Sequence, residues 1–420
     1  MTARFDRLRT LGPYSDQNCT AALIRRLAAA GAALSLLAVL AAPAANAHAA
    51  NCPIPSLPTV CLPDDEEPPP PTPTPTPEPP QPPPVVDPQG ADPNAPNPLV
   101  GLPLFVDSEW HPSWGTYQLW KHRRPRDARQ IYKIARESNF RWFGKWDRNP
   151  FRKIRQYLDK VDEIQPGAVP TITIFRHPHP KHQNPNPNGQ RPDARNRFRP
   201  RRGEYKRAVS WVRSFARGIG DRRVVIAFEP DSLGSMYLLG RKGRKARMDY
   251  LRKGVDILSR LPNATVYLEG GASDWRHAKE TARQLRRIGV HKVRGFMLNV
   301  THFDTTRRSL AHGLKISRRL RGKPFVISTH GNGNGPLHYV KRFGGRNRRV
   351  NVWCNPRNSA LGPRPTTDTS NPKVDAYLWI GRAGFSAGTC RGTPFASQGG
   401  SRPGHWWAER ALKMARRAAY

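Results

Sequence analysis

The feature that most constrains this chain is an alternation of short apolar runs with helical stretches, which begins near residue 97. The apolar runs are rich in Val, Ile and Phe, as is typical of strands buried on both faces. We expect strands at 100–106, 141–145, 169–175, 224–229, 265–270, 293–300, 325–329 and 376–380. Helical periodicity lies near 126–138, 150–163, 203–218, 245–260, 276–288, 307–320 and 405–418. The alternation predicts right-handed βαβ units and an α/β fold, a closed parallel barrel of seven to eight strands.

The N-terminus has the pattern of an export signal. A basic stretch ends at Arg25-Arg26, an apolar run covers residues 27–42, and the small-residue site Ala45-Asn46-Ala47 follows. We therefore expect residues 1–47 to be a signal peptide that is removed from a secreted protein. A membrane anchor is the alternative, but the apolar run is short for a bilayer span and no basic residues follow it.

Residues 48–98 form a short cysteine-containing segment and then a Pro/Thr-rich linker, whose densest part reads PPPPTPTPTPEPPQPPP. This composition favours extended polyproline II and offers almost no apolar side chains to bury. We expect the linker to stay disordered and to tether a single catalytic domain at 99–420.

Five cysteines are present, and their spacings fit no zinc motif, so we expect no metal. Cys19 precedes the apolar run of the leader. The four others, Cys52, Cys61, Cys354 and Cys390, are an even number in an exported chain and allow two disulfides. No nucleotide-binding motif is found either, because the Gly-rich stretch at 331–335 lacks the lysine of a phosphate loop. We expect no cofactor.

The formal net charge is +39, which raises the possibility of a nucleic-acid binder. However, no Lys or Arg occurs between Arg26 and Lys121, and the basic residues that follow are spread along predicted helix faces, as in Arg213 with Arg217. No nucleic-acid module is recognisable. We interpret the charge as a solvated cationic surface of a monomer, which could also adhere to anionic cell-wall polymers.

Two carboxylates stand where the strand predicted at 224–229 ends, in the sequence Glu229-Pro230-Asp231. Like charges held close together cannot both ionise easily, so the pKa of one is expected to rise. A raised carboxyl is suited to protonating a leaving glycosidic oxygen. Helix capping or pairing with arginines is the alternative.

Aromatic and amide side chains follow other predicted strands. Glu269 precedes a Gly-rich turn that leads to Trp275, Asn299 ends another strand, and Trp353 lies in a loop. Indole rings can stack on the apolar faces of sugars, while amides and carboxylates bind hydroxyls. Packing in the core is the alternative role for the tryptophans.

These residues belong to a set of motifs in chain order: NPLVG at 97–101, EPDSL at 229–233, YLEGG at 267–271 with Trp275, Gly295-Phe296 with Asn299-Val300, WCN at 353–355, GPRPTT at 362–367, and DAY at 375–377 with Trp379. Together they resemble glycoside hydrolase family 6, the secreted cellobiohydrolases and endoglucanases. The resemblance covers residues 97–420. It implies a distorted parallel barrel and the hydrolysis of β-1,4-glucan with inversion at the anomeric carbon.

The resemblance also implies roles for individual residues. Asp231 would be the proton donor, and Trp275 and Trp353 would be sugar platforms. Asn299, Glu229 and Glu269 would bind substrate in the cleft. Cys354 would form a disulfide, with Cys390 as its expected partner.

This sequence departs from the family pattern at two places. The stretch at 175–181 reads FRHPHPK, where many members carry an aspartate that assists the donor, and Ala387 stands where the family has an aspartate proposed as the base. An inverting hydrolase ordinarily needs a second carboxylate to activate water. Candidate replacements are His177, His179, Asp274 and Asp304. We expect a secreted glucanase acting on a polysaccharide, and the alternative is a catalytically impaired glycan-binding or cell-wall-associated protein that uses the same cleft.

Overall fold

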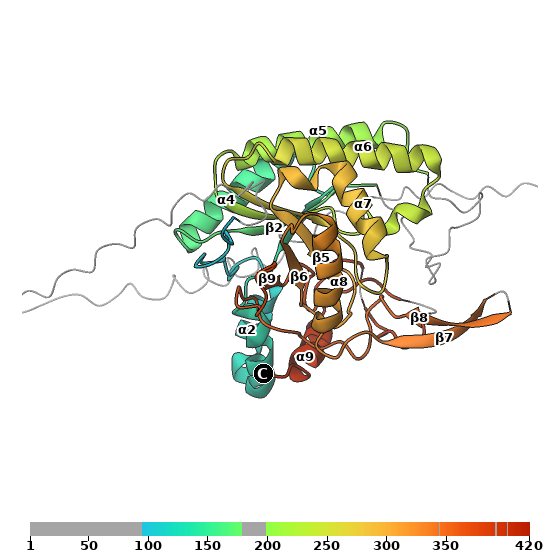
Figure 1. Cartoon of the computed structure of the whole chain (residues 1–420). Coiled ribbons are helices and arrows are strands. Elements are labelled where there is room, and N and C mark those ends of the chain that lie inside the picture. Colours follow the sequence, from blue (N-terminus) through green and yellow to red (C-terminus); the bar gives the residue numbers. More distant parts are fainter. Residues whose placement is uncertain (1–94, 179–198, 344, 391–392, 401) are drawn as a thin grey trace, which may run out of the picture. The chain divides into compact units, whose positions relative to one another are not determined.

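The computed structural model describes residues 95–178, 199–343, 345–390, 393–400 and 402–420. The predicted signal peptide, residues 48–94 of the predicted cysteine-containing segment and linker, and His179 lie outside these residues. At the centre is a parallel sheet of seven strands in the order β1-β2-β3-β4-β5-β6-β9 (Figure 1). The strands are β1 (Arg141–Gly144), β2 (Thr171–Phe175), β3 (Val224–Phe228), β4 (Ala264–Glu269), β5 (Gly295–Leu298), β6 (Phe325–Ser328) and β9 (Val374–Leu378).

The two outer strands of this sheet approach each other. Asn139, just before β1, forms an isolated parallel bridge with Trp379, just after β9, and Phe140 N donates to Trp379 O at 3.2 Å. The sheet therefore curls into a distorted barrel, which confirms the predicted α/β fold.

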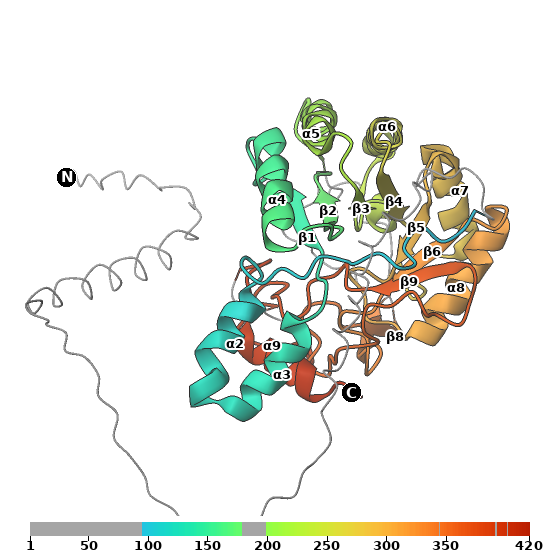
Figure 2. The ribbon, with the colours of Figure 1, turned by 90° about the vertical axis from the view of Figure 1, so that its left-hand side faces the viewer.

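Helices cover the outside of the sheet (Figure 2). They are α4 (Pro150–Ile164), α5 (Glu204–Ile219), α6 (Arg241–Leu258), α7 (Ala278–Ile288) and α8 (Thr306–Arg319). Short 3-10 helices lie at η1 (Gly234–Leu238) and η2 (Val290–Lys292). A second helical group consists of α2 (Pro112–Arg123), α3 (Pro125–Ala135) and α9 (Ala408–Arg416), which share an apolar cluster. No helix among the described residues is long and apolar enough to cross a membrane.

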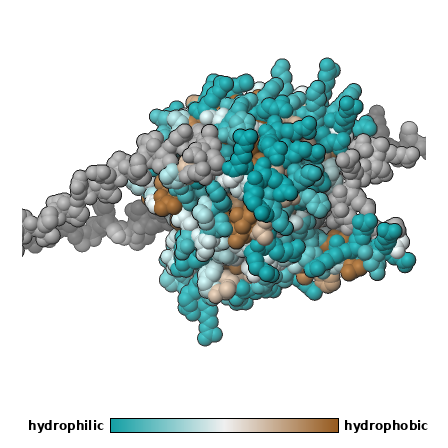
Figure 3. All heavy atoms as spheres, in the orientation of Figure 1, coloured by the Kyte–Doolittle hydropathy of each residue, from teal (hydrophilic) through white to brown (hydrophobic). Residues whose placement is uncertain are grey.

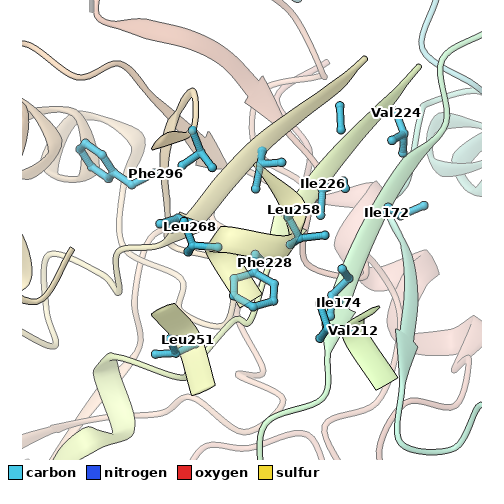
Figure 4. Close-up of a cluster of buried hydrophobic side chains, with 14 of the residues drawn as sticks. Ile172, Ile174, Val212, Val224, Ile226, Phe228, Leu251, Leu258, Leu268 and Phe296 are labelled. Carbon is cyan, nitrogen blue, oxygen red and sulfur yellow. The ribbon is translucent and has the colours of Figure 1, made fainter. Parts of the chain in front are cut away.

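The strands are apolar on both faces, as β3 illustrates. Val224, Ile226 and Phe228 point outwards into a core shared with α5 and α6 (Figure 4). The alternate residues, Val225 and Ala227, belong to a separate cluster inside the barrel. This alternation of direction explains why the strands appear in the sequence as continuous apolar runs.

A buried charged cluster lies at the amino-terminal ends of β5 and β9. The carboxylate of Asp375 accepts from Arg294 Nε at 2.9 Å, from Arg294 Nη2 at 2.8 Å and from Tyr267 Oη at 2.7 Å. Each charge is compensated, so the cluster can be buried.

Some predicted elements differ from the observed ones. Residues 100–106 do not form a strand, and among the described residues they join the sheet through one bridge, between Leu104 and Val169, because Pro103 interrupts this stretch. The sequence also did not predict α2 or the antiparallel hairpin of β7 (His338–Phe343) and β8 (Arg346–Asn351), which projects from the body in Figure 1. The hairpin is rich in arginine and lacks an apolar run.

Candidate active site

The candidate site lies where β3, β4 and β5 end, because the carboxyl ends of parallel strands meet at one edge of a sheet. Three non-glycine residues there have left-handed backbone: Glu229 (φ 59°), Asp231 (φ 68°) and Asn299 (φ 66°). This conformation is strained for side chains with a Cβ and is frequent at functional sites. Here it sets the direction of each polar side chain.

Asp231 is half-buried, and its carboxylate lies beside the turn that follows β5. Thr301 Oγ1 donates to Asp231 Oδ1 at 2.5 Å. The backbone carbonyl of Asp231 accepts from Ser235 N at 3.0 Å and from Ser235 Oγ at 2.5 Å, which fixes the loop before η1. The predicted proton donor is thus held in place and keeps some contact with solvent.

Glu229 points away from Asp231 into the protein interior and is fully buried. Its carboxylate accepts from Arg176 N at 3.0 Å, from His177 N at 2.9 Å, from His177 Nδ1 at 2.6 Å and from Tyr250 Oη. A carboxylate with these partners and no exposed surface cannot reach a sugar. The structure therefore corrects the prediction that Glu229 binds substrate, and assigns it to holding the segment after β2.

His177 shares this burial, with a residue exposure of 1%. Burial lowers the pKa of His177 below its ordinary value, although Glu229 opposes the shift. Its Nδ1 is committed to Glu229, so the structure argues against His177 as the missing base.

Glu269 is the carboxylate that interacts electrostatically with Asp231. It is buried, and Glu269 Oε2 accepts from Leu233 N at 2.7 Å and from Gly234 N at 3.3 Å. Burial, followed by the charge of Asp231, raises the pKa of Glu269 to about 7. The predicted pairing of Glu229 with Asp231 is therefore corrected to a pairing of Glu269 with Asp231. With 3% exposure, Glu269 supports the loop beside Asp231 rather than binding substrate as predicted.

Trp275 is half-buried and stacks on His302, with ring centroids 4.6 Å apart and an interplanar angle of 20°. His302 Nδ1 lies 2.8 Å from Asp274 Oδ1, and Asp274 Oδ2 accepts from Asn351 Nδ2 at 2.6 Å. Burial acts to lower the pKa of His302, but the charge of Asp274 and its hydrogen bond outweigh burial. The pKa of His302 is therefore raised above its ordinary value, and the charges of Asp231 and Glu269 add to this shift. The pair Asp274–His302 is therefore part of the same electrostatic environment as Asp231.

Asn299 and Asp304 stabilise the turn that carries Thr301 and His302. Asn299 Nδ2 donates to Asp304 O at 2.9 Å, and Asp304 N donates to Asn299 Oδ1 at 3.1 Å. Both residues have no exposed surface. This burial corrects the prediction that Asn299 lines the substrate site, and it also removes Asp304 as a candidate base.

Trp353 is half-buried just after β8, beside the disulfide between Cys354 and Cys390, which confirms the predicted pairing. Ala387 N donates to Asn355 Oδ1 at 2.8 Å, so the loop that lacks the expected aspartate is bonded to the segment after Trp353. Within the described ranges, no cluster of His, Cys, Asp or Glu could hold a metal ion.

Sequence reasoning missed Thr301 and His302. Their position directly after Asn299-Val300, at a strand end, was the available signal, but neither residue type stands out there without its spatial neighbours.

Residues 100–418 match the protein family described as glycosyl hydrolases family 6. The chain is 32% identical over 327 residues to endoglucanase A of Cellulomonas fimi, covering 77% of this chain and 63% of that protein. It is 26% identical over 326 residues to endoglucanase A of Thermobispora bispora, a match that covers 76% of this chain and 62% of that protein. The chain thus spans about three fifths of the length of these curated relatives.

Among solved structures, the fold is similar to that of the endoglucanase Cel6 from Mycobacterium tuberculosis in complex with methyl-cellobiosyl-4-deoxy-4-thio-β-D-cellobioside. The TM-score is 0.62 at 30% identity, covering 77% of this chain and 99% of that one. The catalytic domain of a cellobiohydrolase from Chaetomium thermophilum has the same fold, with a TM-score of 0.58 at 18% identity and 77% coverage of this chain.

Proposed function

The chain belongs to glycosyl hydrolases family 6, and from this membership we propose that it hydrolyses β-1,4-glucosidic bonds of cellulose or a related β-glucan. The observation that carries the proposal is the position of Asp231, a half-buried carboxylate at the end of β3 beside Glu269 and the Trp275–His302 stack. The similarity to an endoglucanase solved with a thio-linked cello-oligosaccharide supports this choice of substrate.

In the proposed reaction, Asp231 donates its proton to the leaving glycosidic oxygen as the bond from that oxygen to the anomeric carbon breaks. Water attacks the anomeric carbon from the opposite side, so the configuration inverts. Asp231 is half-buried at the end of β3, and Thr301 fixes its carboxylate while some contact with solvent remains, which supports this role. Trp275 and Trp353 are proposed to contact the sugar rings.

We propose that the Asp274–His302 pair accepts the proton of the attacking water. Asp274 holds Nδ1 of His302 at 2.8 Å, which leaves the other ring nitrogen for proton exchange. The imidazole can accept a proton only in its neutral form. Since the pKa of His302 is raised, this role predicts hydrolysis that increases as pH rises through that pKa.

Release of reducing sugar from soluble β-1,4-glucans across a range of pH tests both roles. Asp231→Ala is expected to lower kcat by about 100-fold or more. The control Asp256→Asn removes an exposed ion pair with Lys292 and is expected to leave kcat unchanged. In Asp274→Asn, the main cause that raises the pKa of His302 is lost, so the residual pH profile is expected to move to lower pH. Unchanged activity of Asp231→Ala would remove Asp231 from its role.

A catalytically impaired glycan-binding protein is the second candidate, favoured by the absence of a carboxylate at Ala387. Retained binding of β-glucans without any hydrolysis by the wild-type protein would establish it. For either function we propose a secreted protein, supported by the leader pattern at 1–47 and by the Cys354–Cys390 disulfide.

A further inference from the structure

A groove of about 800 Å³ lies between α6 and α7, on the outside of the barrel, and η1 forms its inner end. Hydrophilic side chains dominate the face that carries these helices (Figure 3). The side chains that line the groove include Met236, Tyr237 and Met248, which provide an apolar surface. The remaining lining is mostly cationic.

The groove has a strong excess of positive charge. Seven cationic residues line it, against the two carboxylates Asp249 and Glu280. Both carboxylates already have cationic partners. Asp249 Oδ1 lies 3.1 Å from Arg252 Nη1, and Glu280 Oε2 lies 3.9 Å from Arg276 Nη1. The other lining cations are Arg241, Arg244, Lys245, Arg283 and Arg287.

Four of these cations have no acidic partner within the described part of the chain: Arg241, Lys245, Arg283 and Arg287. Arg241 with Lys245, and Arg283 with Arg287, are like-charged pairs four residues apart on one helix, and such pairs destabilise a helix by a few tenths of a kcal/mol each. Arg241 also lies in the first turn of α6, which contains no acidic residue, so its charge opposes the helix dipole. An anion in the groove would offset all of these unfavourable terms.

The inner end of the groove adjoins the candidate active site. Arg276 Nε donates to Gly234 O at 3.1 Å, and its guanidinium lies 4.6 Å from the centre of the Tyr237 ring. The ring of Trp275 packs directly against Gly234, the first residue of η1. The groove therefore begins next to the residue that we propose as a sugar platform.

We propose that this groove binds an anionic polysaccharide, a glycan that carries carboxylate groups along its length. Arginine side chains suit this ligand because the guanidinium can form two parallel hydrogen bonds with a carboxylate. The field of the clustered cations also raises the local concentration of anions at the groove. Tyr237 is the one aromatic side chain among the described residues that line the groove, whereas binding of single-stranded nucleic acid relies on several stacking platforms. The location beside Trp275 rests on the proposed function, but binding in the groove does not require hydrolysis.

The experiment compares two triple charge reversals in the full chain. The groove variant is Arg241→Glu/Lys245→Glu/Arg283→Glu. The control is Lys206→Glu/Arg213→Glu/Arg217→Glu on the exposed face of α5. Like the groove variant, it replaces one lysine and two arginines, so both variants change the net charge by the same amount. Affinity is measured by calorimetry with carboxymethyl cellulose, with neutral hydroxyethyl cellulose and with single-stranded DNA, at low and high salt, after thermal melts have shown that both variants fold.

The groove variant is expected to lose about tenfold or more in affinity for carboxymethyl cellulose at low salt, while the control loses less than about threefold. Equal losses in both variants would show diffuse attraction to a cationic surface and would overturn the proposal. Tighter binding of DNA with the same dependence on the groove would replace the glycan by a nucleic acid.

Hydrolysis of hydroxyethyl cellulose separates this proposal from the proposed function. The groove variant is expected to hydrolyse that neutral glucan at the wild-type rate. Absent hydrolysis with intact groove binding would contradict only the proposed function, and wild-type hydrolysis without groove-dependent binding would contradict only the present proposal.

Discussion

At the scale of single residues, the site depends on where each carboxylate is directed. Asp231 and Glu229 are separated by one residue, yet their side chains diverge because both have left-handed backbone. Glu269, from the neighbouring strand, takes the place beside Asp231, where its pKa is raised to about 7 by burial and by the Asp231 charge.

Glu269→Gln is expected to change how stability depends on pH. The pKa of Glu269 is about 7 in the folded protein and 4.5 in its ordinary state, so the folded protein holds a proton that the unfolded chain releases. Wild-type stability contributed by this group is therefore present below about pH 4.5 and is lost as pH rises through 7. Glutamine can still accept from Leu233 N and Gly234 N but does not titrate.

Urea denaturation at pH 5 and pH 8 checks this expectation. The stability of Glu269→Gln relative to wild type is expected to increase by roughly 2 kcal/mol between these values. The exposed control Glu163→Gln should show no such increase. If the difference in free energy of unfolding between Glu269→Gln and wild type were the same at both pH values, Glu269 would be ionised in the folded protein throughout this range.

The sequence was informative about residues whose chemistry stands out on its own. It indicated Asp231, Trp275 and the pairing of Cys354 with Cys390 through motifs in order. It did not reveal that Glu229 turns inwards, because spacing along a strand assumes regular backbone, and left-handed residues break that assumption. His302 was missed because its role arises from contacts with Asp274 and Trp275, which lie 28 and 27 positions away in the chain.

At the scale of elements, the close approach of α6 to β3 depends on Gly254. A Cβ added at Gly254 would lie 2.4 Å from the Phe228 ring. Phe228 is the last residue of β3, so this contact sets the distance between helix and strand directly before Glu229.

Gly254→Ala is therefore expected to destabilise the protein by about 1–3 kcal/mol through overpacking. Gly115→Ala provides the opposite case, because a Cβ there meets nothing within 4 Å in helix α2, and it is expected to stabilise by about 0.5–1 kcal/mol. Thermal or urea denaturation of the two variants shows whether each substitution lowers or raises the free energy of unfolding. Equal changes in the two variants would show that a small shift of α6 relieves the contact with Phe228.

The strands that are buried on both faces of the sheet were predictable from the sequence. All seven strands of the main sheet were expected, with ends within two residues, because their apolar runs are continuous. The β7–β8 hairpin gave no such signal, since most of its side chains are exposed and several are arginines. A ribbon of this kind is held by backbone pairing, which a sequence pattern does not record.

At the scale of the whole molecule, the segment at 95–105 completes the barrel although it forms no strand. Leu99 and Phe105 are each 2% exposed, and Asn97 Nδ2 donates to Asp375 O at 2.7 Å. These contacts attach the start of the domain to β9, the last strand of the sheet.

A chain that begins at residue 90 is expected to unfold at the same urea concentration as one with residues 48–420. A chain that begins at residue 107 loses Leu99 and Phe105 from the core, and its free energy of unfolding is expected to fall by about 4 kcal/mol or more. Equal stability of the two shortened chains would show that this segment is not part of the cooperative fold.

The overall architecture followed from the sequence because strand–helix alternation permits few topologies. The resemblance to family 6 implied the distortion of the barrel. The strand–helix alternation alone did not, since the bridge between Asn139 and Trp379 depends on three-dimensional curvature.

The bond between Cys354 and Cys390 has a practical consequence for laboratory production. The two sulfur atoms join segments 36 positions apart, and a cross-link over that span is worth roughly 4 kcal/mol in the chain-entropy description. A bacterial host that keeps thiols reduced in its cytoplasm would therefore yield material with a loosened Trp353 segment. Export to an oxidising compartment, or refolding with a glutathione redox couple, is the preparation that preserves this part of the molecule.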